Sequence, residues 1–132
     1  MTDWIQELFS LEEKVALVTG GTGELCGAMA EGLAGAGARV LLVGRNEEKA
    51  RKRLEAIHGA GGKADFLQAD VGTREALEGL LERAQAQAGQ VDIVVNGAGV
   101  NSPTPFLEIS EEELDRIMGV NFRSVFLSCQ VF

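Results

Sequence analysis

The feature that most constrains the fold is the regular alternation of short apolar segments with longer segments of helical character. Residues 14–20 (KVALVTG) and 38–44 (ARVLLVG) are apolar runs rich in β-branched residues and closed by glycine. Such runs are typical of strands that are buried on both faces. Residues 63–70 (KADFLQAD) and 91–99 (VDIVVNGAG) predict two more strands. We therefore predict four strands alternating with helices, in one domain that takes in residues 1–132.

The segments between these strands carry helical periodicity and helix-start signals. Apolar residues recur at helical spacing in the first and third segments: Leu25, Met29 and Leu33, then Leu77, Leu80, Leu81 and Ala84. Asn46 and Thr73 are good N-caps, and Ser110 with Glu113 predicts a capping box. Each crossover helix must pack back onto the sheet that its strand left, so the expected fold is α/β with a doubly wound parallel sheet.

The N-terminal segment carries its own apolar side. Trp4, Ile5, Leu8 and Phe9 would lie on one side of a short helix. We expect this helix to be a packing lid on the domain rather than a helix that binds a partner, because lone amphipathic segments usually belong to a core.

Charge and cysteine content exclude several classes of protein. The net charge is −8, with 20 acidic against 12 basic side chains, so nucleic acid and an anionic membrane surface are not expected partners. No apolar run approaches the ~18 residues of a membrane span. Cys26 and Cys129 are far apart and lack metal-ligand spacing. We expect no metal site and a reducing, cytoplasmic setting.

The turn after the first strand is typical of a phosphate-binding loop. Gly20 permits a tight turn, and Gly23 lets the backbone approach a pyrophosphate. A helix that begins near Glu24 would direct its free N–H groups and its positive dipole end at that group. On this motif alone, a glycine-rich turn that holds no ligand remains an equal alternative.

The residue that follows the second strand bears on the choice of cofactor. An acidic residue there would bind a ribose 2'-hydroxyl, but this sequence has Arg45 instead. Its permanent charge and donor fork suit a 2'-phosphate, which favours NADP over NAD. Glu47 and Glu48 weaken this inference, and a solvated loop arginine is the alternative.

Four motifs together resemble one family. TGGTG (19–23), ADV (69–71), NGAG (96–99) and VNF (120–122) have the order and spacing found in the short-chain dehydrogenases/reductases. The resemblance extends from about Leu8 to the end of the chain. It implies a Rossmann-type sheet and an NAD(P)-dependent oxidoreductase.

The resemblance also implies roles for individual residues. Asp70 and Val71 correspond to the pair that contacts adenine, and Asn121 to the asparagine of a catalytic tetrad that helps to hold a water in a proton relay. The full set of implied cofactor-binding residues is Gly20, Gly21, Thr22, Gly23, Leu25, Arg45, Asn46, Asp70, Val71, Asn96, Gly97, Ala98 and Gly99. Two structural alternatives remain open. Asp70 could cap a turn, and Asn121 could be a buried polar helix residue whose side chain bonds to neighbouring backbone.

Two residues depart from the family pattern. Glu24 and Cys26 stand where many relatives have glycine. We expect Glu24 to point to solvent, and Cys26 to be accommodated between helix and strand with a slight outward shift of the helix. A catalytic cysteine is not expected, because the only histidine, His58, lies far along the chain at the surface.

The family's serine, tyrosine and lysine follow the tetrad asparagine, whereas this chain has no tyrosine and ends at Phe132. We interpret the sheet as truncated after the fourth strand and the following helix, and we expect these 132 residues alone to be inactive. In the intact enzyme, the resemblance implies hydride transfer between a nicotinamide cofactor and an alcohol or ketone. The segments LFSLEEKVALVTGGTG and CQVF resemble the sugar-acid branch and suggest a sugar acid as substrate.

Two other functions remain as alternatives. A non-catalytic nucleotide-binding or scaffolding module is favoured by the missing tyrosine, and a methyltransferase is disfavoured because VGRN lacks an acidic residue to bind the ribose of its cofactor.

The fourth strand would form an open edge of the sheet, and Val125, Phe126 and Phe132 would lose the elements that cover them. We therefore expect a homo-oligomer or a partner chain that completes the sheet.

Overall fold

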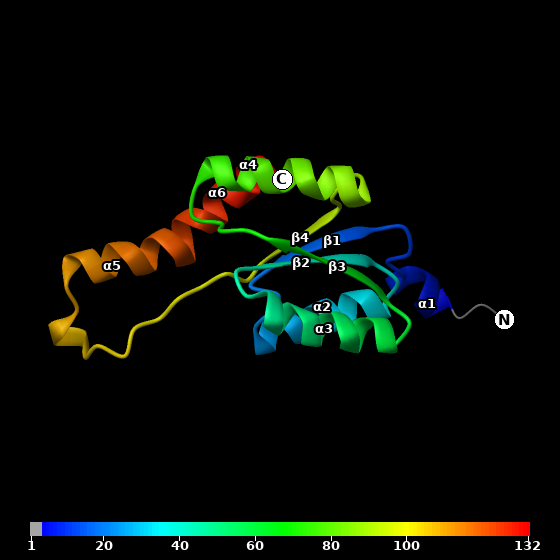
Figure 1. The fold of residues 1–132 in the computed structure, drawn as a ribbon, viewed down its shortest axis with the longest axis horizontal. Coiled ribbons are helices and arrows are strands. Elements are labelled where there is room, and N and C mark those ends of the chain that lie inside the picture. Colours follow the sequence, from blue (N-terminus) through cyan, green and yellow to red (C-terminus); the bar gives the residue numbers. More distant parts are fainter. Residues whose placement is uncertain (1–3) are drawn as a thin grey trace.

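A four-stranded parallel sheet lies at the centre of the chain (Figure 1). The structure is a computed structural model and describes residues 4–132. The strands are β1 (Val15–Thr19), β2 (Arg39–Gly44), β3 (Lys63–Gln68) and β4 (Ile93–Asn96), hydrogen-bonded in the order β3-β2-β1-β4. Every pairing is parallel. The four predicted strands and the doubly wound parallel arrangement are confirmed.

Helices cover both faces of this sheet. Helices α2 (Glu24–Gly35) and α3 (Glu47–Gly59) lie on one face, and α4 (Arg74–Ala88) and α6 (Ser124–Val131) on the other (Figure 1). The remaining elements are α1 (Trp4–Phe9), the 3-10 turn η1 (Phe106–Glu108), α5 (Glu111–Met118) and the π-helical turn η2 (Gly119–Arg123). A loop after β4 carries η1 and α5 away from the body of the domain, and η2 and α6 lead back to it (Figure 1).

The central strand β1 is buried on both sides. Ala16 and Val18 pack into the apolar cluster beneath α2 and α3. Val15 and Leu17 face the opposite cluster, which contains residues of α4. This division follows from the alternation of side chains along a strand. Because all strands run the same way, their carboxyl ends meet at one edge of the sheet.

The predicted N-caps are present, and one detail of the capping box is wrong. Side chains of Asn46, Thr73 and Ser110 each accept a hydrogen bond from the backbone N–H three residues later, at 2.9, 3.2 and 3.1 Å. Glu113 does not return the bond to Ser110. Its Oε1 accepts hydrogen bonds from the hydroxyls of Ser102 and Thr104, the latter at 2.9 Å. Glu113 therefore links the loop after β4 to α5 by hydrogen bonds.

The apolar spacing of Leu25, Met29 and Leu33 predicts helix α2 correctly, but of these three only Leu33 packs against the core. Leu25 and Met29 are exposed, whereas Cys26, Ala30 and Ala34 are buried against the sheet. Small side chains let the helix lie close to the strands, which explains why the larger apolar side faces outward. In α4, by contrast, the predicted stripe is the buried side.

The expectation of an N-terminal lid is wrong for the described residues. Trp4, Leu8 and Phe9 are exposed, and α1 has no buried residue. The helix has six residues and lies at one end of the domain (Figure 1). Contact with the core begins at the half-buried Leu11, whose N–H donates to the Ala36 carbonyl at 2.7 Å.

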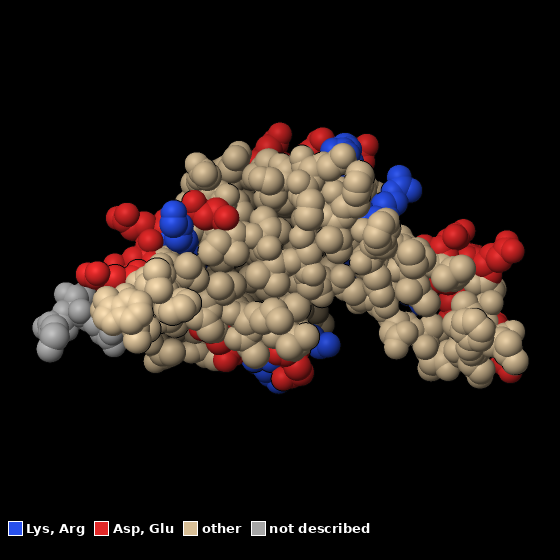
Figure 2. Space-filling model, turned by 180° about the vertical axis from the view of Figure 1, so that it is seen from behind, with Lys and Arg blue, Asp and Glu red and all other residues tan. Residues whose placement is uncertain are grey.

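Strand β4 bonds to β1 on one side, and no strand within residues 4–132 pairs with its other side. Phe126 is exposed, as expected for an incomplete sheet. Val125 and Phe132 are half-buried, which corrects the expectation that both lose their cover; Phe132 packs on the cluster beneath α4 because α6 returns to the sheet. Seen from behind, the middle of the molecule carries few charged side chains, while acidic groups gather at its two ends (Figure 2).

Candidate functional site

A cleft of about 370 Å³ lies at the carboxyl ends of the strands. All four strand-end loops and η2 contribute to its lining, which comprises Gly20, Thr22, Gly23, Val43, Gly44, Arg45, Ala69, Asp70, Val71, Gly97, Ala98, Gly99, Val100 and Val120. Open parallel sheets bind ligands at this edge. The structure therefore brings the glycine-rich turn, Arg45 and Asp70 together around one space.

A second hollow, of about 530 Å³, lies at the opposite end of the strands. Some of its charged residues are paired. Arg39 forms two hydrogen bonds with Asp65, at 3.1 and 2.8 Å, and Lys14 lies 3.8 Å from Asp92. We take the cleft at the carboxyl ends of the strands as the candidate site, because open parallel sheets bind ligands there.

Gly20 shapes the turn in two ways. Its φ of +67° lies in the left-handed region, which confirms the expectation of a tight turn that favours glycine. A Cβ at this position would also lie 2.5 Å from the carbonyl oxygen of Gly97. Gly97 in turn has no room for a Cβ, because Cys26 Sγ occupies that space. The turn after β1 and the loop after β4 are thus in direct backbone contact.

Thr19 joins these two loops, and the sequence analysis did not single it out. Its buried hydroxyl accepts hydrogen bonds from the N–H groups of Gly97 and Ala98, at 3.0 and 3.2 Å, and donates to the carbonyl of Val95 at 3.3 Å. A threonine at the end of a buried strand, directly before a glycine-rich turn, was the available signal. Its role is to fix the loop after β4 against β1.

Helix α2 begins differently from helices α3, α4 and α5. Side chains of Asn46, Thr73 and Ser110 cap helices α3, α4 and α5, whereas Gly23 at the start of α2 provides no capping side chain. The first N–H groups of a helix have no partner within the helix. Since Gly23 lines the cleft, the start of α2 combines unpaired donors with a positive dipole end at the candidate site.

Arg45 is exposed and lines the cleft. Within residues 4–132, its guanidinium makes no hydrogen bond or ion pair, while its carbonyl accepts from Gln68 Nε2 at 3.1 Å. Glu48 bonds to Arg51 at 2.7 Å, so this carboxylate is engaged along α3. Arg45 can therefore offer its donors to a ligand.

Asp70 and Val71 both line the cleft after β3. The carboxylate Oδ1 of Asp70 accepts a hydrogen bond from the Gly72 N–H at 2.9 Å. The turn-capping alternative thus describes part of what Asp70 does. A carboxylate has further acceptor positions, so one backbone bond does not use up its capacity.

Asn121 lies in η2 beside the cleft, not in its lining. Its Oδ1 accepts from the N–H of Val100 at 2.7 Å, and its Nδ2 donates to the Val100 carbonyl at 2.8 Å. The structural alternative is therefore right that Asn121 bonds to backbone and wrong that the residue is buried, because Asn121 is exposed. Single π-helical turns often occur at functional sites. Here the turn contains Asn121, which is hydrogen-bonded to the loop after β4.

Four other predicted site residues also lie outside the lining of the cleft. Gly21 faces β2, where a Cβ would lie 2.9 Å from Leu42 Cδ2. Leu25 is exposed on the outer side of α2, and Asn46 caps α3. Asn96 Nδ2 lies 3.7 Å from Cys129 Sγ, so its side chain turns towards α6.

Glu24 points to solvent and Cys26 is accommodated, as expected, while the outward shift of α2 stays a prediction. The Glu24 side chain is fully exposed, and Cys26 is buried with its Sγ 3.9 Å from the Gly97 carbonyl.

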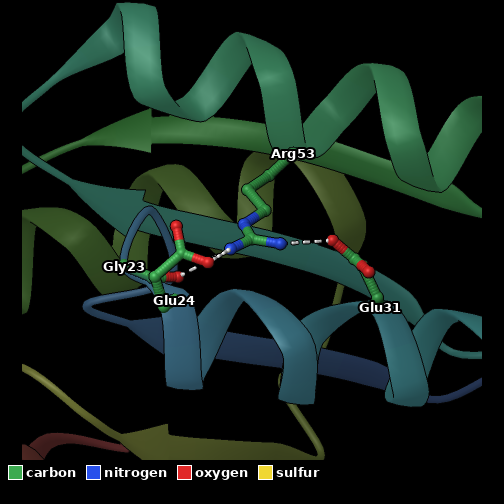
Figure 3. A network of polar contacts seen from close by, with 4 residues as sticks. All are labelled: Gly23, Glu24, Glu31 and Arg53. Carbon is green, nitrogen blue, oxygen red and sulfur yellow. Dashed lines mark hydrogen bonds and ion pairs between the residues drawn. The ribbon is translucent and has the colours of Figure 1, made fainter.

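The side chain of Arg53, on α3, extends to the turn that precedes α2 (Figure 3). Its hydrogen bond to Glu31 and the charges of Glu24 and Glu31 raise the pKa of Arg53, against a smaller opposing effect of burial. His58 is exposed, as predicted, and its Nε2 lies 2.8 Å from the Ala64 carbonyl.

Residues 4–132 contain no group of three or more histidine, cysteine, aspartate or glutamate side chains arranged to hold a metal ion. None of the helices in this range has the length and apolar character needed to cross a membrane.

Residues 14–132 match the family model described as short chain dehydrogenase, and the chain belongs to this family. It is 40% identical over 126 residues to 2-dehydro-3-deoxy-D-gluconate 5-dehydrogenase of Escherichia coli, covering 96% of this chain and 49% of that protein. It is 34% identical over 120 residues to a 3beta-hydroxysteroid dehydrogenase of Mediterraneibacter gnavus, covering 90% and 44%. The chain thus spans about half the length of these curated relatives.

A solved structure of this family has a similar fold. A metagenomic short-chain oxidoreductase in complex with NADP superimposes with a TM-score of 0.85 at 32% identity, covering 92% of this chain and 56% of that one. The Rossmann-type fold expected from the sequence is confirmed by this similarity together with the observed sheet.

Proposed function

We propose that the cleft binds a nicotinamide dinucleotide, with NADP preferred to NAD. The observation that carries the proposal is the start of α2, the one long helix of residues 4–132 that begins at the cleft without a capping side chain. Uncapped N–H groups at a helix start are suited to a pyrophosphate. The relative solved in complex with NADP supports the same assignment.

The preference for NADP rests on Arg45. Its guanidinium is unpaired within residues 4–132 and lies at the end of β2, where a bound ribose 2'-phosphate would gain a charge-assisted bond. The other proposed contacts are backbone groups of Gly20 to Gly23 with the pyrophosphate, and Asp70 and Val71 with the adenine. Gly97 to Gly99 form the opposite wall of the cleft.

In the whole protein, we propose an oxidoreductase acting on an alcohol or ketone. The bound cofactor would supply the hydride chemistry, and the protein would supply orientation and proton transfer. We keep Asn121 as a proposed member of the proton relay, and its two bonds to Val100 fix the position of its carboxamide. The 132 residues contain no tyrosine, so we place the Ser-Tyr-Lys group outside them.

A sugar acid is the substrate that we propose. The support is the similarity to the Escherichia coli gluconate-type enzyme. We further propose a cytoplasmic setting, since Cys26 and Cys129 are both free thiols. A homo-oligomer, or a partner segment that pairs with β4, would complete the sheet.

Calorimetric titration tests the proposed cofactor. NADPH is expected to bind the purified chain, NADH more weakly, and S-adenosylmethionine not at all. Affinity is expected to be modest, because ordering of the loops opposes binding. Binding of S-adenosylmethionine alone would favour a methyltransferase, and no binding by either dinucleotide would refute the proposal.

A further inference from the structure

Arg53 spans the outer side of the glycine-rich turn (Figure 3). Its Nη1 donates to Glu31 Oε1 at 2.6 Å, and its Nη2 donates to Glu24 Oε2 at 3.1 Å and to the Gly23 carbonyl at 3.4 Å. The guanidinium lies over Gly27, where a Cβ would collide with it. One side chain of α3 therefore holds the first turn of α2 at several points.

This contact involves Glu24, one of the two residues that depart from the family pattern. Glu24 is the first residue of α2. Its carboxylate therefore belongs to the same helical turn as the backbone N–H groups that we propose as donors to a pyrophosphate. A carboxylate in the first turn is attracted by the positive end of the helix dipole. Turned inward, it would compete with the pyrophosphate for those N–H groups and repel its charge.

We propose that Arg53 is a positioning residue of the cofactor site, which holds the Glu24 carboxylate on the outer side of the turn and so keeps the start of α2 available to the pyrophosphate. This inference rests on the proposed function. Arg53 does not line the cleft, so it acts on the cofactor through Glu24 and Gly23.

The shape of the arginine head suits this role. Glu31 binds one end of the guanidinium fork, which leaves the other end fixed in front of Glu24 and the Gly23 carbonyl. An arginine stays charged at any pH at which the protein is folded, so a positive charge always stands beside Glu24. The side chain of Arg53 is 19% exposed, which limits its freedom to leave Glu24.

The test is a set of variants titrated with NADPH by calorimetry in low salt. Arg53→Met frees the Glu24 carboxylate and is expected to weaken NADPH binding roughly three- to tenfold. Adding Glu24→Gln to Arg53→Met removes the competing charge and is expected to restore affinity to within about twofold of the parent chain. Arg53→Lys keeps a positive charge beside Glu24 and is expected to retain most of the affinity.

Lys52→Met is the matched control. It removes one positive charge from the same helix, but Lys52 is exposed and forms no hydrogen bond or ion pair within residues 4–132, so NADPH affinity is expected to stay unchanged. Salt gives a second readout. The loss caused by Arg53→Met is expected to shrink as NaCl is raised, because an electrostatic effect is screened and a packing defect is not.

The outcomes separate this inference from the proposed function. If the parent chain binds no dinucleotide, the proposed function fails and this inference fails with it. If the parent binds NADPH, the inference alone is overturned when Arg53→Met binds equally well, or when the double variant binds as weakly as Arg53→Met. Arg53→Gln replaces Arg53→Met if the latter does not fold. If neither folds, Arg53 serves folding, and its role towards the cofactor is rejected.

Discussion

Replacing Gly20 by valine perturbs the turn at its most constrained point. The φ of +67° costs a residue with a Cβ about 1–2 kcal/mol, and a β-branched residue more. The new Cβ would also lie 2.5 Å from the Gly97 carbonyl oxygen, so the loop after β4 must move, at roughly 1–3 kcal/mol for overpacking. Together these effects oppose the binding conformation by about 2–5 kcal/mol, which lowers NADPH affinity by at least about thirtyfold.

The assay for Gly20→Val is NADPH titration alongside urea unfolding. Gly32→Ala is the matched control, because a Cβ at Gly32 meets no atom within 4 Å and this glycine lies inside α2. There, alanine is expected to raise the free energy of unfolding by up to ~1 kcal/mol and leave NADPH affinity unchanged. Gly20→Ala serves in place of valine if the latter does not fold. A folded Gly20→Val chain that binds NADPH like the parent would show that this turn does not hold the phosphates.

Four further expectations concern cofactor choice, packing, assembly and activity. Arg45→Asp should lower the preference for NADPH over NADH roughly tenfold or more, and an unchanged preference would remove Arg45 from the site. Cys26→Gly should leave NADPH affinity intact or improved while lowering the free energy of unfolding by about 1 kcal/mol, and clear loss of binding would contradict this. The chain should self-associate through the open edge of β4 and the exposed Phe126, unless a partner completes the sheet; a monomer in light scattering at high micromolar concentration would contradict it. The 132 residues alone should not oxidise NADPH with any ketone, and oxidation that survives Asn121→Ala would reveal other catalytic groups.

The strands and the helix starts could be predicted because their signals are local. The β1 and β2 segments are apolar on both faces, and Asn46, Thr73 and Ser110 each bond a backbone N–H only three residues away. Residues close in sequence therefore determine where these strands and helices form. The cleft followed from the same logic, since the ends of parallel strands must meet.

The sequence could not show contacts that depend on how the elements pack. Leu25 faces outward because α2 approaches the sheet through small residues, and this depends on the tertiary structure. Glu113 bonds Ser102 and Thr104 rather than completing a capping box, because the loop after β4 folds against α5. Arg53 contacts Glu24 across 29 residues of sequence, and no local pattern links them.

The central claim is that the cleft at the carboxyl ends of the strands holds a nicotinamide dinucleotide. Amide NMR spectra of the 15N-labelled chain during NADPH titration test it residue by residue. The account predicts shifts for Gly20, Gly23 and Gly97, which line the cleft, and none for Gly37, which lines the hollow at the opposite end of the sheet. Unchanged signals for the three cleft glycines, or shifts confined to Gly37, would contradict it.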